Sequence, residues 1–113
     1  MNMNKDKVNR DDIYAALASP VRRKVLGMLR KQAMTAGDIA DEVSVSKPTL
    51  SGHLKILKSA DLIHVERQGA HLLYRINLSV AEEALTGLMD LFELGAPKNS
   101  RSIVSPIKKR RQT

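Results

Sequence analysis

The 113-residue chain contains no cysteine and no tryptophan, and aromatic residues make up only 3% of it. Without cysteine it has no disulfide, no thiolate metal ligand and no cysteine nucleophile. No apolar run approaches the roughly 20 residues needed to span a bilayer, so we expect no membrane insertion. The polar first ten residues also lack the apolar segment of a secretion signal. We therefore expect a cytoplasmic protein whose core is mainly aliphatic.

Acidic residues are absent from the C-terminal end of the chain, so most of the net charge of +7 comes from that end. Six of the 19 basic residues follow residue 94 with no acid among them, namely Lys98, Arg101, Lys108, Lys109, Arg110 and Arg111. The other 13 basic residues are nearly balanced by the 12 acidic ones, so total charge is a weak argument for a nucleic-acid partner. We expect a flexible N-terminus over 1–10, one folded domain over 11–95, and a basic disordered tail over 96–113.

Apolar spacing and turn signals predict a mainly α fold with a small β part, made of five helices and one two-stranded hairpin. Helices are expected over 11–18, 20–31, 35–43 and 46–60, and from a Ser79 cap to about residue 94. Strands are expected over 63–67 and 71–76, joined by the three residues Gln68-Gly69-Ala70.

Residues 35–60 carry the strongest functional signal, because two short helices joined by a tight turn can set the second helix into the major groove of DNA. No acid occurs between Val43 and Ala60, and a leucine stripe at 50, 54 and 57 must face the core. The residues predicted to contact bases or to fix the register on DNA are Lys47, Thr49, Ser51 and His53. Ser46 is also predicted to bind DNA, because the backbone N–H groups from Ser46 to Thr49 favour a nearby phosphate. The competing interpretation is an ordinary solvated helix face, since surface lysines are common.

Phosphate contacts are predicted at Lys55 on the same helix, at Arg22 and Arg23 near the start of 20–31, and at Arg67. Arg67 and Gln68 at the hairpin tip are predicted to bind DNA either in the minor groove or at phosphate. A solvated hairpin tip is the alternative for the last two residues.

The last helix is apolar on more sides than one small domain can cover, which is typical of an interface. We expect it to pack, with the first helix, against a second copy of the chain, through Ile13, Leu17, Leu85, Leu88, Met89 and Phe92. A twofold pair also supplies two recognition helices for one DNA site. The alternative is that the helix closes the core of a monomer.

The chain resembles the ArsR/SmtB superfamily of bacterial repressors over three segments: Leu17-Ala-Ser-Pro-Val-Arg-Arg-Lys-Val-Leu26, Met34-Thr-Ala-Gly-Asp-Ile-Ala40 and Ser46-Lys-Pro-Thr-Leu-Ser-Gly-His-Leu-Lys-Ile-Leu57. The resemblance covers about residues 12–94 and is nearest to the metal-independent SdpR-like autorepressors. It implies a winged helix-turn-helix with the hairpin as the wing. It also implies a nucleoid-associated homodimer that represses transcription from an inverted-repeat operator.

The chain departs from the metal-sensing members of this superfamily at the positions of their ligands. Thr35 and Gly37 stand where those members carry cysteines, and a second known site corresponds to Leu78, Val80, Leu91 and Leu94. None of these side chains is a metal ligand, and the histidines at 53, 64 and 71 lack ligand spacing. We therefore expect no metal and no cofactor. The effector is left open between a small organic ligand, another protein, and none beyond autoregulation.

Motifs of catalysis are also missing: there is no paired-carboxylate signature, no glycine-rich phosphate loop and no nucleophile motif. An enzyme is not expected. The alternative to a DNA-binding repressor is a winged-helix module that docks on a protein partner and touches nucleic acid only weakly.

Overall fold

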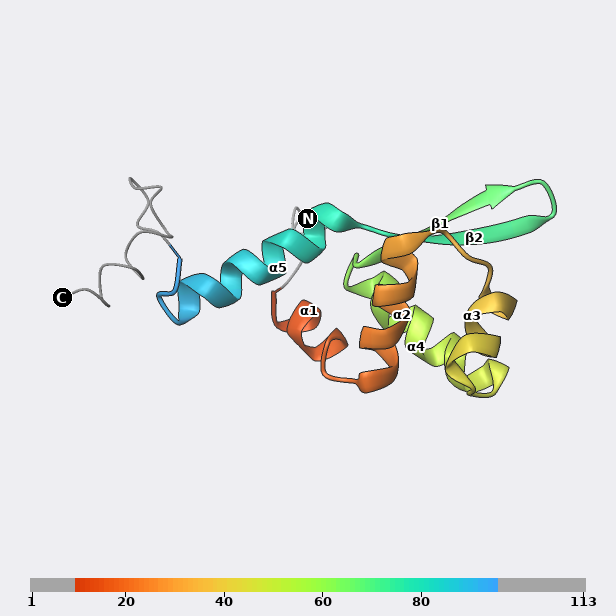
Figure 1. Cartoon of the computed structure of the whole chain (residues 1–113), viewed down its shortest axis with the longest axis horizontal. Helices are drawn as coiled ribbons and strands as arrows, with labels where there is room; N and C mark the ends of the chain where they lie inside the picture. The colour runs from red at the N-terminus through yellow and green to blue at the C-terminus, as the bar shows by residue number, and fades with distance from the viewer. Residues whose placement is uncertain (1–9, 96–113) are drawn as a thin grey trace, which may run out of the picture.

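A computed structural model describes residues 10–95, which form five helices and one hairpin in the predicted order (Figure 1). In chain order the elements are α1 Arg10–Ala16, α2 Pro20–Lys31, α3 Ala36–Val43, α4 Lys47–Ser59, β1 Ile63–Gln68, β2 His71–Ile76 and α5 Leu78–Leu91. The predicted mainly α fold with a two-stranded wing is confirmed. The predicted tail, and all of the predicted N-terminal segment except Arg10, lie outside the described residues.

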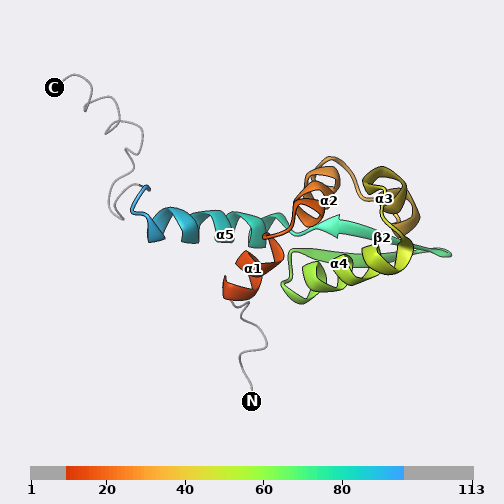
Figure 2. The same ribbon diagram turned by 90° about the horizontal axis from the view of Figure 1, so that it is seen from below.

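Helices α1 to α4 pack around one aliphatic core, and the hairpin and α5 extend from opposite ends of this body (Figures 1 and 2). Fully buried side chains come from α1, α2, α3, α4 and the segment that enters β1, namely Ile13, Val25, Ile39, Leu50, Leu57, Leu62 and Ile63. The leucine stripe of α4 is at most 4% exposed, as predicted. Burying one such side chain contributes about 1.5–3 kcal/mol, so the stripe fixes which side of α4 faces outward.

The C-terminal end of α4 is closed by a left-handed residue that turns the chain into the hairpin. Asp61 has a φ of 61°. Its N–H donates to the Lys58 carbonyl, and the N–H of Leu62 donates to the Leu57 carbonyl. This pair of bonds is the Schellman arrangement, which satisfies carbonyl groups at a helix end. It takes Leu62 straight from the helix into the core, where it is 0% exposed.

The hairpin turn is shorter than the predicted three residues. Strand β1 continues through Gln68, which pairs with His71, so only Gly69 and Ala70 connect the strands. Gly69 has a φ of 64°, a conformation that glycine adopts without steric cost. The glycine therefore allows the tighter connection.

Backbone hydrogen bonds tie the segment between α2 and α3 to the hairpin. The Met34 N–H donates to the Tyr74 carbonyl at 3.1 Å, and the Tyr74 N–H donates to the Met34 carbonyl at 2.7 Å. Helix α3 begins at Ala36, so this bridge holds its N-terminus beside β2. Every residue except proline carries the groups that form such a bridge, and the sequence therefore has no pattern that predicts it.

Helix α5 begins and ends earlier than predicted. Its N-cap is Asn77, whose side-chain oxygen accepts from the Val80 N–H at 3.4 Å, whereas Ser79 lies inside the first turn. Asparagine and serine are equally good caps, so the sequence alone did not separate the two positions. The helix ends at Leu91, and Glu93 then adopts a φ of 54°, which turns the chain before Gly95.

Helix α5 approaches α1 closely at Gly87. A β-carbon at this position would lie 2.6 Å from the Tyr14 hydroxyl oxygen, so glycine is what allows this approach with the tyrosine in place. Val80 and Ala84, which precede Gly87 on the same side of α5, are buried in the core.

Five large apolar side chains of α5 and its C-terminal end are exposed, namely Leu78, Leu85, Leu91, Phe92 and Leu94. Despite this apolar surface, no helix within residues 10–95 is long and apolar enough to cross a membrane. Ile13, predicted at a dimer interface, is only 1% exposed in the single chain. It is therefore a residue of the monomer core, because a surface available to a partner needs exposed atoms.

Replacement of the cap residue tests the corrected start of α5. We expect Asn77→Ala to lower the free energy of unfolding by about 1 kcal/mol, because the Val80 N–H loses its side-chain acceptor. The matched control, Ser79→Ala, should change it by less than about 0.5 kcal/mol, since this exposed serine lies past the cap. Urea unfolding followed by far-ultraviolet circular dichroism measures both, and a larger loss in Ser79→Ala would restore Ser79 as the cap.

Candidate nucleic-acid interface

The outer face of α4 holds the residues predicted to contact bases. Lys47, Thr49, Ser51 and Lys55 are all exposed, outside the buried leucine stripe; at about 100° per residue, Lys47, Ser51 and Lys55 share one side of the helix and Thr49 lies on the other. Helix α4 contains no acidic residue, so no carboxylate on the helix opposes a phosphate backbone laid against this face. The exposed part of α4 thus provides hydrogen-bond donors and positive charge on a single helix, which is what readout of a DNA groove requires.

Ser46 is the N-cap of α4 and orients Thr49. Its Oγ accepts from the Thr49 N–H at 3.2 Å, and the two hydroxyl oxygens are 2.9 Å apart. When Ser46 donates to the Thr49 hydroxyl, the hydroxyl hydrogen of Thr49 stays available for an acceptor outside the protein. Guanine N7 and O6 and phosphate oxygens are such acceptors. Ser46 is exposed as well, but its hydroxyl is engaged in the cap.

Arg22 and His53 are brought together by the fold. Arg22 Nε donates to the Ala16 carbonyl at 2.7 Å, Nη2 donates to the Ala15 carbonyl at 3.2 Å, and Nη1 lies 3.0 Å from His53 Nδ1. Because a guanidinium has donors only, His53 Nδ1 must accept, and we infer that the ring carries its proton on Nε2. The Arg22 side chain thus ties the end of α1 to the middle of α4.

The other predicted phosphate contacts lie apart from α4. Arg23 is exposed and donates through Nη1 to the Leu17 carbonyl at 2.7 Å. Arg67 and Gln68 are exposed at the hairpin tip and point to opposite faces, because side chains alternate along a strand. The pairing register puts Arg67 on the hairpin face of Tyr74, which borders α4. Only the Arg67 face of the wing therefore continues the surface of α4.

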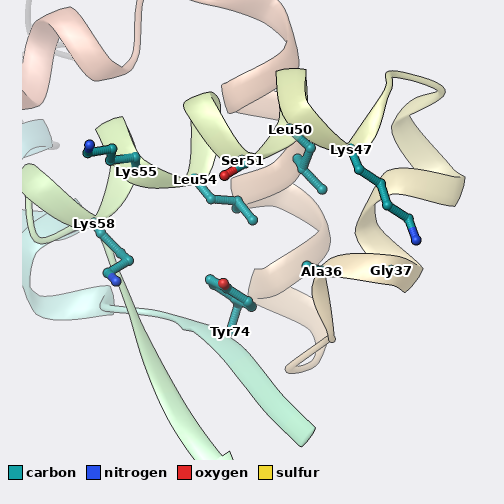
Figure 3. Close-up of a pocket in the computed structure, with 9 residues that line it drawn as sticks. All are labelled: Ala36, Gly37, Lys47, Leu50, Ser51, Leu54, Lys55, Lys58 and Tyr74. Carbon is teal, nitrogen blue, oxygen red and sulfur yellow. The ribbon is translucent and has the colours of Figure 1, made fainter.

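A pocket of about 540 Å³ lies between α4, the start of α3 and Tyr74 of β2 (Figure 3). Three of the predicted DNA-contacting residues line it: Lys47, Ser51 and Lys55. Lys58 lines it too, and sequence reasoning gave this residue no role although it continues the same helix face one turn further. Tyr74 could not be found from the sequence, since its position depends on the backbone bridge to Met34.

Comparison with known proteins agrees with this geometry. A helix-turn-helix domain model matches residues 17–66, which include α2, α3 and α4. The transcriptional repressor SdpR of Bacillus subtilis is 36% identical to the chain over 85 residues, covering 75% of this chain and 94% of SdpR. The HTH-type transcriptional repressor SmtB of Mycobacterium tuberculosis is 38% identical over 65 residues, covering 58% of this chain and 48% of that protein.

The solved structures include a similar fold. An ArsR-like transcriptional regulator from Rhodococcus sp. RHA1 matches with a TM-score of 0.68, over 74% of this chain and 79% of that one. The sequences are 21% identical, so this likeness concerns the fold alone.

The bonds of Arg22 predict a stability difference between two neighbouring arginines. Arg22→Lys keeps the charge but loses the fork that joins two carbonyls and His53, so the free energy of unfolding should fall by about 1–2 kcal/mol. Arg23→Lys is the matched control, and loss of its single exposed bond should change the value by less than about 0.5 kcal/mol. Urea unfolding compares them, and equal losses would show that the Arg22 bonds do not hold α1 on α4.

Proposed function

The chain belongs to the ArsR/SmtB family of winged helix-turn-helix transcriptional repressors, and we propose that it binds an inverted-repeat operator in duplex DNA as a homodimer. The observation that carries this proposal is the exposed face of α4, which combines lysines and hydroxyls with no acid on the helix. Each α4 would enter a major groove, and the occupied operator would exclude RNA polymerase. Such a protein works in the cytoplasm, in association with the nucleoid.

The proposed contacts divide between bases and phosphates. Lys47, Thr49 and Ser51 reach base edges, and His53 fixes the register from its half-buried position on the same helix. Lys55, Arg23, Arg67 and Gln68 contact phosphate, the wing residues from outside the groove that holds α4. Arg22 supports these contacts through its bond to His53.

Gly52 is the position at which the backbone of α4 would come closest to DNA. In the free protein a β-carbon there would have no atom of the described residues 10–95 within 4 Å, so the packing of this part of the chain does not need glycine at this site. Glycine inside a helix costs about 0.8–1.0 kcal/mol relative to alanine. A bare backbone against the groove gives a reason for this cost, because any side chain would hold the helix away from the base edges.

Gly52→Ala should therefore separate stability from DNA affinity. We expect the free energy of unfolding to rise by up to about 1 kcal/mol, while affinity for the operator falls about tenfold or more. The operator is first selected with the wild-type protein from a random pool of duplexes. Fluorescence anisotropy with that duplex then measures the dissociation constant of each variant.

Gly27→Ala is the matched control. Gly27 lies on α2, is exposed, and would also give a β-carbon no atom within 4 Å. It should gain stability without losing affinity. If Gly52→Ala binds the operator as tightly as Gly27→Ala, α4 does not approach DNA at this residue. If the wild-type protein selects no duplex at low salt, the repressor proposal is wrong and docking on a protein partner takes its place.

The proposed dimer interface is the exposed apolar stripe of α5. Leu78, Leu85 and Phe92 recur every seven residues, with Ala81 and Leu88 at the intervening positions, which is the pattern of paired helices. Leu85 is 59% exposed and Phe92 62% exposed in the single chain. Leu17, Leu88 and Met89, also predicted at the interface, are half-buried. A twofold pair built on this stripe would present two α4 helices to half-sites about 34–36 Å apart.

A charge in the middle of this stripe should separate the two subunits. Leu85→Glu would bury a carboxylate against its symmetry mate, so we expect a monomer at micromolar concentration by analytical ultracentrifugation. Leu72→Glu is the matched control, because Leu72 is also exposed, at 43%, but lies on the wing. It should remain dimeric. A wild-type protein that sediments as a monomer contradicts the dimer, and a dimeric Leu85→Glu contradicts this interface.

We also propose that release from DNA does not use a metal at the sites of the metal-sensing relatives. Among residues 10–95, no three histidine, aspartate or glutamate side chains gather into a potential metal site. The Thr35 hydroxyl accepts from the Asp38 N–H as the cap of α3, and Gly37 has no side chain. The α5 positions of the second site are aliphatic, so neither set offers the ligands that zinc requires.

A further inference from the structure

We propose that the pocket between α4, α3 and β2 binds an aromatic organic anion, and that this ligand competes with DNA for α4. The competition, unlike the binding itself, rests on the proposed function. The pocket volume of about 540 Å³ lies within the range of roughly 300–1,000 Å³ that is usual for small-molecule sites. Two chemistries meet in it, an apolar lining and a set of lysines.

The apolar lining consists of Ala36, Leu50, Leu54 and Tyr74. In Figure 3 the Tyr74 ring faces the two leucines across the pocket. The position of the ring is fixed by the backbone of Tyr74, which is hydrogen-bonded to the backbone of Met34. Leu50 and Leu54 are nearly buried and form the floor of the pocket, whereas Ala36 and Tyr74 are half-buried. A flat aromatic body in the pocket would cover the apolar surface of Ala36 and Tyr74 that water now contacts, and it would find an aromatic partner in the Tyr74 ring.

The positive charge comes from Lys47, Lys55 and Lys58, and within residues 10–95 no acidic residue lines the pocket. Lys47 and Lys58 lie toward its two ends (Figure 3). They are eleven residues apart on α4, or about 16 Å at 1.5 Å per residue. A ligand with its body along the leucines can therefore place a carboxylate or sulfonate at a lysine, and charge-assisted hydrogen bonds of this kind are stronger than neutral ones.

The composition of the pocket also distinguishes it from a site that binds only a DNA phosphate group. A phosphate group would use the lysines but would leave the exposed apolar surface of Ala36 and Tyr74 uncovered. An organic anion uses both parts of the lining. Since Lys47, Ser51 and Lys55 belong to the pocket and to the proposed DNA contacts, the two ligands would exclude each other. Linkage then requires that each lowers the affinity for the other by the same factor.

Direct binding is tested with the fluorescent probe 8-anilinonaphthalene-1-sulfonate and full-length protein. We expect saturable fluorescence enhancement, and at least about tenfold weaker binding of N-phenyl-1-naphthylamine, which has the same aromatic body without the sulfonate. Lys58→Gln should weaken sulfonate binding by about threefold to tenfold, since it removes one charged partner. Lys31→Gln, an exposed lysine at the end of α2, is the matched control and should leave it unchanged.

Filling the pocket supplies a second variant. A β-carbon at Gly37 would meet only the Thr35 hydroxyl oxygen, at 4.0 Å, so Gly37→Leu has room to fold and adds bulk to the lining. It should weaken probe binding about tenfold or more. If neither Gly37→Leu nor Lys58→Gln changes the affinity for the probe, the probe binds elsewhere, for instance on the apolar stripe of α5, and the pocket proposal is wrong.

Competition is measured in a separate titration with labelled operator, taking the operator affinity of each variant without probe as its own reference. The sulfonate should weaken operator binding by the wild-type protein and do so much less in Gly37→Leu. Pocket-dependent probe binding that leaves the operator affinity unchanged would overturn the competition. Pocket-dependent binding by a protein that selects no duplex would support the ligand site and refute the repressor function, so the two proposals fail separately.

Discussion

Burial of one leucine stripe on α4 sets which side of this helix is left for the proposed contacts with DNA and for the pocket. Successive residues of a helix are rotated by about 100°, so once Leu50, Leu54 and Leu57 enter the core the rotation of the helix about its axis is settled. The ends of α4 support the same orientation. Ser46 closes the N-terminal turn, and Asp61 turns the chain so that Leu62 joins the core. Because the leucines occupy the buried side of α4, its lysines and hydroxyl residues lie on the exposed sides.

One consequence is that a single helix borders two different environments. Its outermost residues face solvent, while the residues nearer β2 border the pocket closed by Tyr74. The exposed residues of α4 in both environments are therefore not chosen for the stability of the fold alone. Gly52 keeps a backbone that alanine would stabilise, and the lysines of α4 stand close together without a carboxylate on the helix. Local departures of this kind, with no benefit to the fold, are expected at functional sites.

The sequence predicted those features that depend on side-chain pattern and missed those that depend on tertiary contacts. Helical spacing of leucines and the Gly69 turn signal led to the right elements, because hydrophobic period and turn chemistry are written in residue types. The Met34–Tyr74 bridge uses backbone groups alone, and so it left no signal. The three partners of Arg22 come from α1 and α4, and only packing brings them within reach of one guanidinium.

The start of α5 shows a third kind of limit, because Asn77 and Ser79 are both good caps and the choice between them depends on how the preceding strand is held. The N–H of Asn77 donates to the Leu62 carbonyl at 2.8 Å, which fixes that residue at the end of the hairpin. Its side chain is then in place to cap the helix that follows. The sequence thus offered two N-caps for α5, and the hydrogen bond to Leu62, fifteen residues earlier in the chain, selects Asn77.

The contacts that attach α5 to α1 also connect the proposed dimer surface to the proposed DNA surface. Helix α5 approaches α1 at Gly87, under the Tyr14 side chain. The last carbonyls of α1 are bound by Arg22, and Arg22 in turn reaches His53 in the middle of α4. Each of these contacts joins two helices directly, without a loop between them. In a twofold pair formed through α5, the distance between the two α4 helices would follow from this packing and from few other degrees of freedom. A fixed half-site spacing requires such a connection, because two recognition helices on flexible arms would accept operators of many lengths.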